Sequence, residues 1–246
     1  MLTNETISKL NDMRLGVMAK AFNEQMNDPQ YNALSFEDRF AFLVDAEWAT
    51  RKSNHLNQLI KNASYSAPSA CIENIEYLPE RKLDKSQILQ LSTCTYVLEA
   101  HNVILLGATG SGKTYLACAL GMAANRNFYT VKYIRLPDLL VEIAIARGDG
   151  TYREVMKKYK KVRLLILDEW LLYPLKESEA RDLLELVEAR SKVASTIFCS
   201  QFDTPGWHEN LYDPTLADAI CDRIIYDSYT IRIEGDSMRK RKGIPE

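Results

Sequence analysis

The chain has 246 residues, of which 46% are hydrophobic and 26% charged, enough for one large α/β domain and a smaller accessory domain. Its net charge of −2 excludes binding of nucleic acid through an overall positive field, so any such role requires a local basic cluster. No apolar stretch approaches the roughly 20 residues of a membrane span, and the five cysteines lack C-x-x-C spacing, so we expect a cytoplasmic protein with no membrane partner, disulfide framework or zinc site.

Residues 1–62 are predicted to form a small all-helical interaction domain. Apolar side chains recur at helical spacing between Ile7 and Phe22, and a further helix begins near Ser35, with Asp38 three residues on as in a capping motif. One face of that helix carries an apolar stripe of Phe36, Phe40, Leu43, Val44 and Trp48. The stripe is either the core of a helical bundle or a face that docks a partner, because two or three helices alone make a marginal core.

The rest of the chain has the pattern of a linker followed by an α/β domain. Residues 63–85 are rich in Ser, Pro and acidic residues without a clear period, which predicts a linker between the domains. From residue 86 onward, short apolar runs alternate with helical segments such as 177–194, which predicts a doubly wound parallel sheet with helices on both faces. The five expected strands are 103–106, 131–134, 164–167, 196–200 and 229–233. Ligands of such sheets bind where the strands end.

A complete phosphate-loop motif, G-x-x-x-x-G-K-[ST], directly follows the first predicted strand. It comprises Gly107, Ala108, Thr109, Gly110, Ser111, Gly112, Lys113 and Thr114, and Tyr115 continues it into a predicted helix. In such a loop backbone N–H groups surround the phosphates, the lysine reaches the β- and γ-phosphates, and the final hydroxyl binds Mg²⁺. The N-terminus of the following helix favours the same anions. The sequence therefore predicts a site for a nucleoside triphosphate and Mg²⁺.

Polar residues also follow the third and fourth predicted strands. We assign Asp168 to Mg²⁺ binding and Glu169 to orienting and deprotonating the attacking water. A phosphate-loop kinase transfers its phosphoryl group to a bound acceptor and needs no such glutamate, so this pair favours an ATPase. Gln201 follows the fourth strand and is a candidate sensor of the γ-phosphate or the water, although a simple strand-end turn explains the same residue.

Arg223 lies late on a predicted helix whose other face is apolar. It is a candidate to reach the γ-phosphate held by a neighbouring subunit, where a cation neutralises the charge of the transition state. The alternative is a simple ion pair with Asp218 or Asp222 nearby on the same helix. The residue pattern by itself favours the ion pair.

The most basic stretch of the chain spans residues 157–163 and surrounds a tyrosine. Such a cluster can neutralise DNA phosphates without reading sequence, and it equally suits a solvated helix face ahead of a buried strand. The candidate DNA-binding residues in and before this stretch are Arg147, Arg153, Lys157 and Lys158.

The sequence resembles the IstB family of transposition helper ATPases, in the AAA+ clade that also contains DnaC-type helicase loaders. The resemblance covers nearly the whole chain and includes strings outside the phosphate loop. These are residues 13–19, 34–39, 114–120, 146–150, 207–208, 213–220 and 235–240. It implies that residues 86–246 form an AAA+ P-loop NTPase domain without a full C-terminal lid, and it leaves Arg239 without an assigned role.

The resemblance also implies a function. Members of this family are ATP-dependent DNA-binding ATPases that oligomerise on double-stranded target DNA, with ATP at subunit interfaces, and recruit or stimulate an IstA-like transposase of an insertion sequence. Arg223 then falls at the position of the arginine finger, and residues 136–162 form an insertion that faces DNA. A DnaC-type helicase loader and a nucleotide-gated DNA-binding scaffold are the alternatives, whereas Glu169 disfavours a small-molecule kinase.

Overall fold

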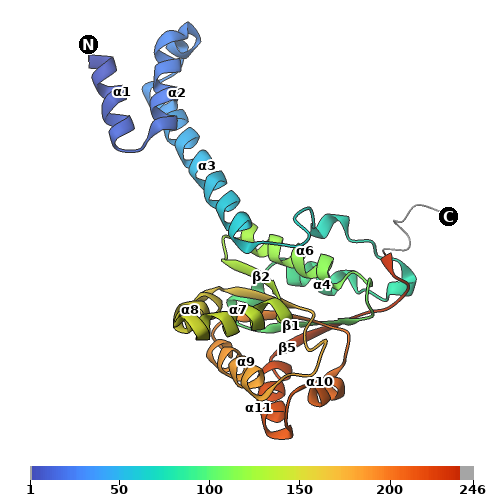
Figure 1. Ribbon diagram of the computed structural model, residues 1–246. Helices are drawn as coiled ribbons and strands as arrows, with labels where there is room; N and C mark the ends of the chain where they lie inside the picture. Colours follow the sequence, from blue (N-terminus) through green and yellow to red (C-terminus); the bar gives the residue numbers. More distant parts are fainter. Residues whose placement is uncertain (1, 239–246) are drawn as a thin grey trace, which may run out of the picture. The chain divides into compact units, whose positions relative to one another are not determined.

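The computed structural model describes residues 2–238, and the chain divides into two compact units, one ending at Gln58 and one beginning at Leu59 (Figure 1). The first unit contains α1 (Leu2–Asp12), α2 (Gly16–Asn27), the 3-10 helix η1 (Pro29–Ala33) and most of α3 (Phe36–Ala63). The helix start predicted near Ser35 is confirmed. The Ser35 hydroxyl accepts a hydrogen bond from the Asp38 N–H at 3.1 Å and donates one to the Asp38 carboxylate at 2.8 Å.

The apolar stripe on α3 is largely exposed to solvent. Leu43 is buried, but the four other side chains are exposed: Phe36 at 75%, Phe40 at 52%, Val44 at 40% and Trp48 at 60%. The interpretation of this stripe as a bundle core is therefore wrong for four of its five members. The helix contacts α2 through a polar group instead, because Glu47 accepts hydrogen bonds of 3.1 and 3.0 Å from two N–H groups in the first turn of α2.

The second unit is built on a five-stranded parallel sheet, and all five predicted strands are confirmed. The strands are β1 (Asn102–Gly107), β2 (Val131–Arg135), β3 (Leu164–Asp168), β4 (Ser195–Ser200) and β5 (Ser228–Ile233), in the order β2-β3-β4-β1-β5. The central strands are buried on both faces, which is why they read as continuous apolar runs. Because β4 lies between β1 and β3, the residues after these three strands share one edge of the sheet.

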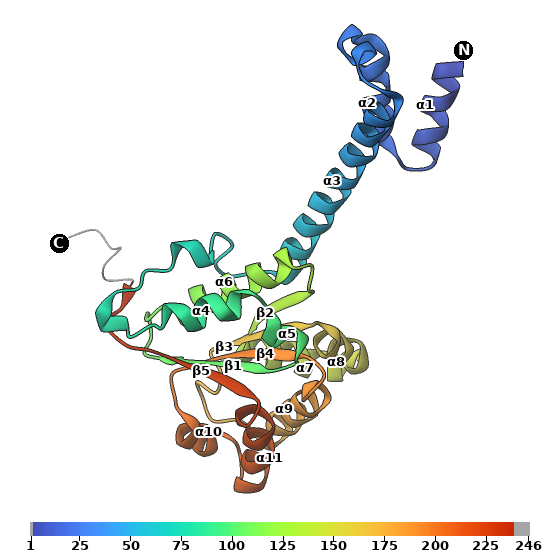
Figure 2. The same cartoon turned by 180° about the vertical axis from the view of Figure 1, so that it is seen from behind.

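Helices cover both faces of the sheet, as predicted (Figures 1 and 2). Buried residues of α4 (Lys85–Ser92), α5 (Thr95–Leu98) and α6 (Lys113–Arg126) pack in one core. The other face packs against α7 (Leu136–Asp149), α8 (Tyr152–Lys161), α9 (Glu177–Arg190), α10 (Thr204–Asn210) and α11 (Pro214–Ile225). On β1, Val103 and Leu105 belong to the first core and Ile104 and Leu106 to the second, as strand alternation requires. Within the described residues, no helix is long and apolar enough to span a membrane.

The linker predicted at residues 63–85 is instead part of the second unit. This stretch contains the 3-10 helices η2 (Ile72–Asn74) and η3 (Pro79–Arg81). Ala63, Ala70 and Ile75 are buried in the same core as α6. The prediction failed because, after Ala63 at the end of α3, the apolar residues of this stretch are irregularly spaced and belong to coil and single turns, which give neither a helical nor a strand period.

Candidate nucleotide-binding site

The phosphate loop connects the carboxyl end of β1 to the first turn of α6. Gly110 and Gly112 have φ angles of +81° and +99°, a region that side chains with a Cβ rarely adopt. The Lys113 ammonium donates hydrogen bonds to the carbonyl oxygens of Gly107 at 2.6 Å and Ala108 at 2.9 Å. The loop therefore places one cation and the N-terminus of α6 where phosphates bind.

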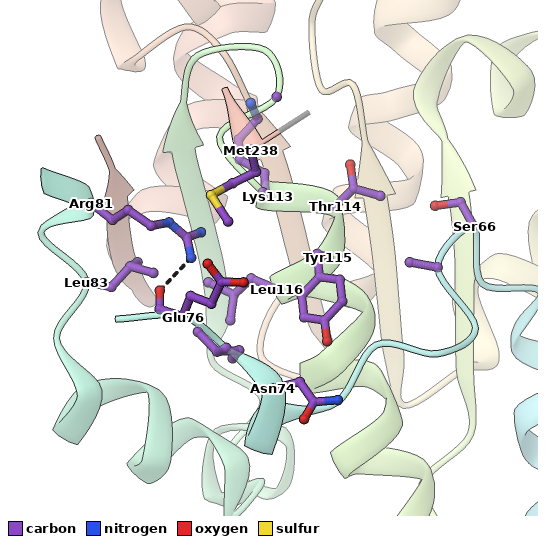
Figure 3. Close-up of a pocket in the computed structure, with 14 residues that line it drawn as sticks. Ser66, Asn74, Glu76, Arg81, Leu83, Lys113, Thr114, Tyr115, Leu116 and Met238 are labelled. Carbon is purple, nitrogen blue, oxygen red and sulfur yellow. Dashed lines mark hydrogen bonds between the residues drawn. The ribbon is translucent and has the colours of Figure 1, made fainter. Parts of the chain in front are cut away.

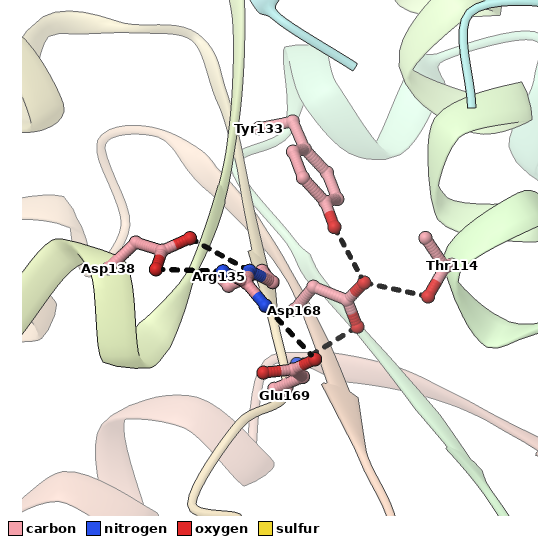
Figure 4. A network of polar contacts seen from close by, with 6 residues as sticks. All are labelled: Thr114, Tyr133, Arg135, Asp138, Asp168 and Glu169. Atoms are coloured by element: carbon pink, nitrogen blue, oxygen red, sulfur yellow. Dashed lines mark hydrogen bonds and ion pairs between the residues drawn. The ribbon is translucent and has the colours of Figure 1, made fainter. Parts of the chain in front are cut away.

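Asp168 is the centre of a buried polar network at the end of β3 (Figure 4). Its Oδ2 accepts hydrogen bonds from the Thr114 hydroxyl at 2.7 Å and from the Tyr133 hydroxyl at 2.8 Å. Its Oδ1 accepts the backbone N–H of Glu169 at 2.9 Å. Burial raises the pKa of Tyr133, a hydrogen bond with Ser66 opposes the shift, and the Asp168 charge reinforces it.

These oxygens suit Mg²⁺. Thr114 and Asp168 present a hydroxyl and a carboxylate oxygen 2.7 Å apart beside the phosphate loop. Mg²⁺ prefers hard oxygen ligands and is commonly held by one or two protein groups together with phosphates and water. The two residues that the sequence assigned to the metal are thus brought together by the fold.

Glu169 lies next to Asp168 but is held toward β2. Its backbone has a φ of +54°, and its Oε1 is 3.9 Å from the Arg135 guanidinium (Figure 4). Arg135 also binds both carboxylate oxygens of Asp138, at 2.8 and 2.9 Å. That hydrogen-bonded pair, with Glu169 adding a smaller contribution, raises the pKa of Arg135. The glutamate assigned to water activation is therefore paired with an arginine that belongs to none of the sequence motifs.

Gln201 closes the other side of the same cleft. Its Oε1 accepts a hydrogen bond of 2.9 Å from the Thr109 hydroxyl of the phosphate loop. The residues that line the cleft come from the phosphate loop, β3 and β4 and include Lys113, Thr114, Asp168, Glu169 and Gln201. A strand-end turn does not require this contact with the phosphate loop, so the position of Gln201 is compatible with a sensor.

A larger cavity of about 530 Å³ lies beside the phosphate loop (Figure 3). Its walls combine the phosphate loop and Tyr115 with residues of the stretch expected to be a linker, among them Asn74, Glu76, Arg81 and Leu83. Arg81 is 7% exposed, and its guanidinium donates hydrogen bonds to the carbonyl oxygens of Ser111 at 3.0 Å and Glu76 at 2.7 Å. The volume suits the nucleoside part of a nucleotide whose phosphates lie in the loop. No sequence signal marked these residues.

The family model described as "IstB-like ATP binding protein" matches residues 8–244. The chain belongs to the IstB-like ATP-binding protein family. It is 38% identical over 242 residues to the insertion sequence ATP-binding protein y4pL of Sinorhizobium fredii, with 98% of each chain covered. It is 41% identical over 216 residues to the ATP-binding protein of insertion sequence IS1162 of Pseudomonas fluorescens, with 84% of this chain and 94% of that protein covered.

Solved structures show the AAA+ fold of this IstB-like chain. A DnaC helicase loader superposes with a TM-score of 0.58 at 15% identity, over 68% of this chain and 97% of that chain. The replication initiator DnaA bound to AMPPCP and single-stranded DNA gives a TM-score of 0.58 at 21% identity, over 70% of this chain and about half (52%) of that chain. At these identities the likeness concerns the fold alone. The recognition of an AAA+ protein of the IstB family from its sequence is confirmed.

In the IstB-like chain, Arg223 is not brought to its own phosphate loop. It lies near the end of α11, donates to the Ala219 carbonyl at 2.7 Å and pairs with Glu188 on α9 at 3.0 Å. It shares a small cavity with Asn102 at the start of β1 and Thr196 near the start of β4, at the opposite edge of the sheet from the phosphates. The expected pair with Asp218 or Asp222 is wrong, because the partner carboxylate comes from a neighbouring helix.

The candidate DNA-binding residues of this IstB-like protein fall into two groups. Arg147 pairs with the buried Asp182 and stacks on the Tyr152 ring, and Lys158 pairs with Glu142 at 2.8 Å. Arg153 and Lys157 are exposed on α8, and none of the ion pairs among residues 2–238 includes them. Two of the four candidates are therefore paired within the protein, and the other two, Arg153 and Lys157, are left for a partner. Arg239 lies outside the described residues.

Proposed function

We propose that the chain is a Mg²⁺-dependent ATPase that assembles as a homo-oligomer on double-stranded target DNA and recruits or stimulates an IstA-like transposase. The observation that carries the proposal is the convergence of Lys113, Asp168 and Glu169 on one cleft. Their arrangement provides a phosphate-binding cation, a metal ligand and a base for water. Membership of a family whose relatives are named as insertion sequence ATP-binding proteins supports the transposition context.

The arrangement of the cleft supports hydrolysis of ATP. The loop N–H groups and Lys113 would bind the β- and γ-phosphates. Thr114 and Asp168 would hold Mg²⁺, which would neutralise part of the phosphate charge. Glu169 accepts the proton of the attacking water once its carboxylate has left Arg135. Gln201 orients the water or the γ-phosphate from the far side of the cleft.

Arg223 supports placing the ATP site at a subunit interface. Since it lies at the edge of the sheet away from its own phosphate loop, it can act only on the ATP of another copy. The neighbouring Tyr226 is 83% exposed, and a large exposed aromatic side chain suits a protein interface. A contact between unlike edges of identical subunits is heterologous and propagates into a ring or a helical filament.

The exposed cations of α8 support DNA binding. Arg153 and Lys157 have no ion-pair partner within residues 2–238. Such side chains bind backbone phosphates and position the protein without reading the base sequence. We therefore expect binding to duplex DNA with strong salt dependence and little sequence preference.

The assembly can be tested by light scattering of the protein with and without duplex DNA, in ATP, ADP or a slowly hydrolysed ATP analogue. We expect large particles only when DNA and a triphosphate are both present. A monomer under every condition refutes the role of Arg223 and the interface site. Co-purification with a replicative helicase in place of a transposase would favour the alternative of a helicase loader.

The role of hydrolysis can be tested with Glu169→Gln, using the exposed Glu177→Gln on α9 as a control. The first substitution should lower turnover by about 10²-fold or more and keep nucleotide binding, because it removes the base but not the phosphate contacts. The control should leave turnover unchanged. If the Glu169 variant loses turnover yet supports normal transposition, the protein is a nucleotide-gated scaffold and hydrolysis is incidental.

A further inference from the structure

We propose that Tyr133 is a positioning residue for the Asp168 carboxylate and thereby sets the affinity of the nucleotide site for Mg²⁺. This inference rests on the proposed function, in which Asp168 binds the metal. It concerns a residue on β2 that belongs to neither the phosphate loop nor the acidic pair after β3.

The geometry is specific to one carboxylate oxygen. Strand β2 pairs in parallel with β3, and Tyr133 lies opposite Ile166, two residues before Asp168. The Tyr133 side chain is 8% exposed, and its hydroxyl donates to Asp168 Oδ2 at 2.8 Å (Figure 4). The same oxygen accepts the Thr114 hydroxyl at 2.7 Å. The oxygen placed toward the magnesium-binding threonine is thus the one that the tyrosine holds.

Tyr133 acts through Asp168 and does not touch the nucleotide. It lines neither the cleft between the phosphate loop and β4 nor the larger cavity beside the loop. Its ring packs in the core on the α6 face of the sheet, so the position of the hydroxyl is fixed by buried neighbours. Catalytic and metal-binding groups are held most accurately by hydrogen bonds from rigid neighbouring residues of this kind.

The bond controls the rotation of the carboxylate. The terminal torsion of an aspartate is broad, so a carboxylate with no fixed donor samples many orientations about its last bond. The Glu169 N–H fixes Oδ1 and the Tyr133 hydroxyl fixes Oδ2, which together hold the plane of the Asp168 carboxylate. If the Thr114 oxygen bound Mg²⁺, the hydrogen bond of Thr114 to Oδ2 would be weakened. Tyr133 would then be the hydroxyl that still holds Oδ2.

The test is Tyr133→Phe, which removes the hydroxyl and keeps the packed ring. Binding of a fluorescent ATP analogue is measured first in EDTA and then across a Mg²⁺ titration, and Mn²⁺ binding to the nucleotide complex is followed by electron paramagnetic resonance. We expect unchanged nucleotide affinity in EDTA and about a 10-fold weaker apparent affinity for either ion. Losses of this size are typical when a residue that hydrogen-bonds to a metal ligand is removed. A purely structural role would not separate the two affinities.

Tyr96→Phe is the matched control. Tyr96 is 2% exposed in the same core, and its hydroxyl has no hydrogen-bond partner within the described residues. Its loss should leave both affinities unchanged. The proposal is overturned if Tyr133→Phe keeps the wild-type affinity for Mg²⁺ and Mn²⁺, or if it weakens nucleotide binding in EDTA to the same degree.

Asp168→Asn separates this inference from the proposed function. If Asp168→Asn abolishes the response to Mg²⁺ while Tyr133→Phe does not change it, only the positioning role fails. If Asp168→Asn itself leaves the response intact, the metal site of the proposed function fails, and the role of Tyr133 fails with it. Loss of the response in Asp168→Asn with a 10-fold shift in Tyr133→Phe supports both.

Discussion

Complementation between two inactive variants tests whether ATP is hydrolysed at a subunit interface. Arg223→Ala keeps its phosphate loop but offers no arginine to its neighbour, and Lys113→Ala keeps the arginine but lacks the ammonium at the phosphates. Each variant alone should be nearly inactive, because an arginine finger contributes roughly 10³-fold or more to turnover. The Arg223 variant should still bind ATP, whereas the Lys113 variant should not.

The size of the recovery follows from the placement of the two residues at opposite edges of the sheet. In a head-to-tail assembly of an equal mixture, an active interface needs the Arg223 variant as the ATP-binding subunit and the Lys113 variant as its neighbour. This occurs at about one quarter of the interfaces if subunits mix at random, so turnover should recover to about a quarter of that of the wild type. A site completed within one chain would recover nothing.

The assay is steady-state ATP turnover with saturating duplex DNA across mixing ratios, with recovery expected to peak at equal amounts. The control is Arg232→Ala, which removes an exposed arginine from β5 and should be fully active alone. Absence of recovery at every ratio, with mixed particles confirmed by light scattering, would refute action of Arg223 on a neighbouring subunit. Full activity of Arg223→Ala by itself would refute any catalytic role for this residue.

Two further predictions concern DNA binding and stability. Replacing both Arg153 and Lys157 with Ala should weaken DNA binding about equally for all duplex sequences and reduce the slope of log affinity against log salt by about 2. An unchanged slope would assign Arg153 and Lys157 to a solvated helix face. The charge-matched control replaces Arg126 and Arg181, which are both in ion pairs. Arg190→Met should lower the free energy of unfolding in urea by about 3–5 kcal/mol. Arg190 is 2% exposed, and its guanidinium donates to Tyr159 O, Val162 O and Thr196 Oγ1, which would stay buried without a donor. The control is Arg181→Met, which breaks an exposed ion pair within a helix and should cost less than about 0.5 kcal/mol; equal losses in the two variants would contradict this account.

Much of the α/β core was predictable because its signals are local. The five strands are apolar runs buried on both faces, and the phosphate loop is a contiguous string whose glycines and lysine have fixed roles. The position of Asp168 beside the loop also followed, since parallel strands end at one edge of the sheet. These inferences need only chain order and one rule of topology.

Other parts of the site depend on contacts that sequence order does not reveal. Arg81 and Glu76 line the larger cavity beside the phosphate loop, although the sequence of their stretch predicts a polar linker. Tyr133 and Arg135 reach Asp168 and Glu169 because β2 pairs with β3 in one particular register. The sequence of β2 does not distinguish an ordinary sheet strand from one whose side chains contact Asp168 and Glu169.

The sequence by itself determined the phosphate-loop motif, the order of strands and helices, and the family, because each of these depends on contiguous motifs or regular periods. The tertiary structure decided which charges are already paired and which are free to act. Arg147 and Lys158 are neutralised by carboxylates from other segments, and Arg223 is directed away from its own phosphate loop. Such pairing depends on distances between residues far apart in the chain, and those distances exist only after the sheet and its helices have packed.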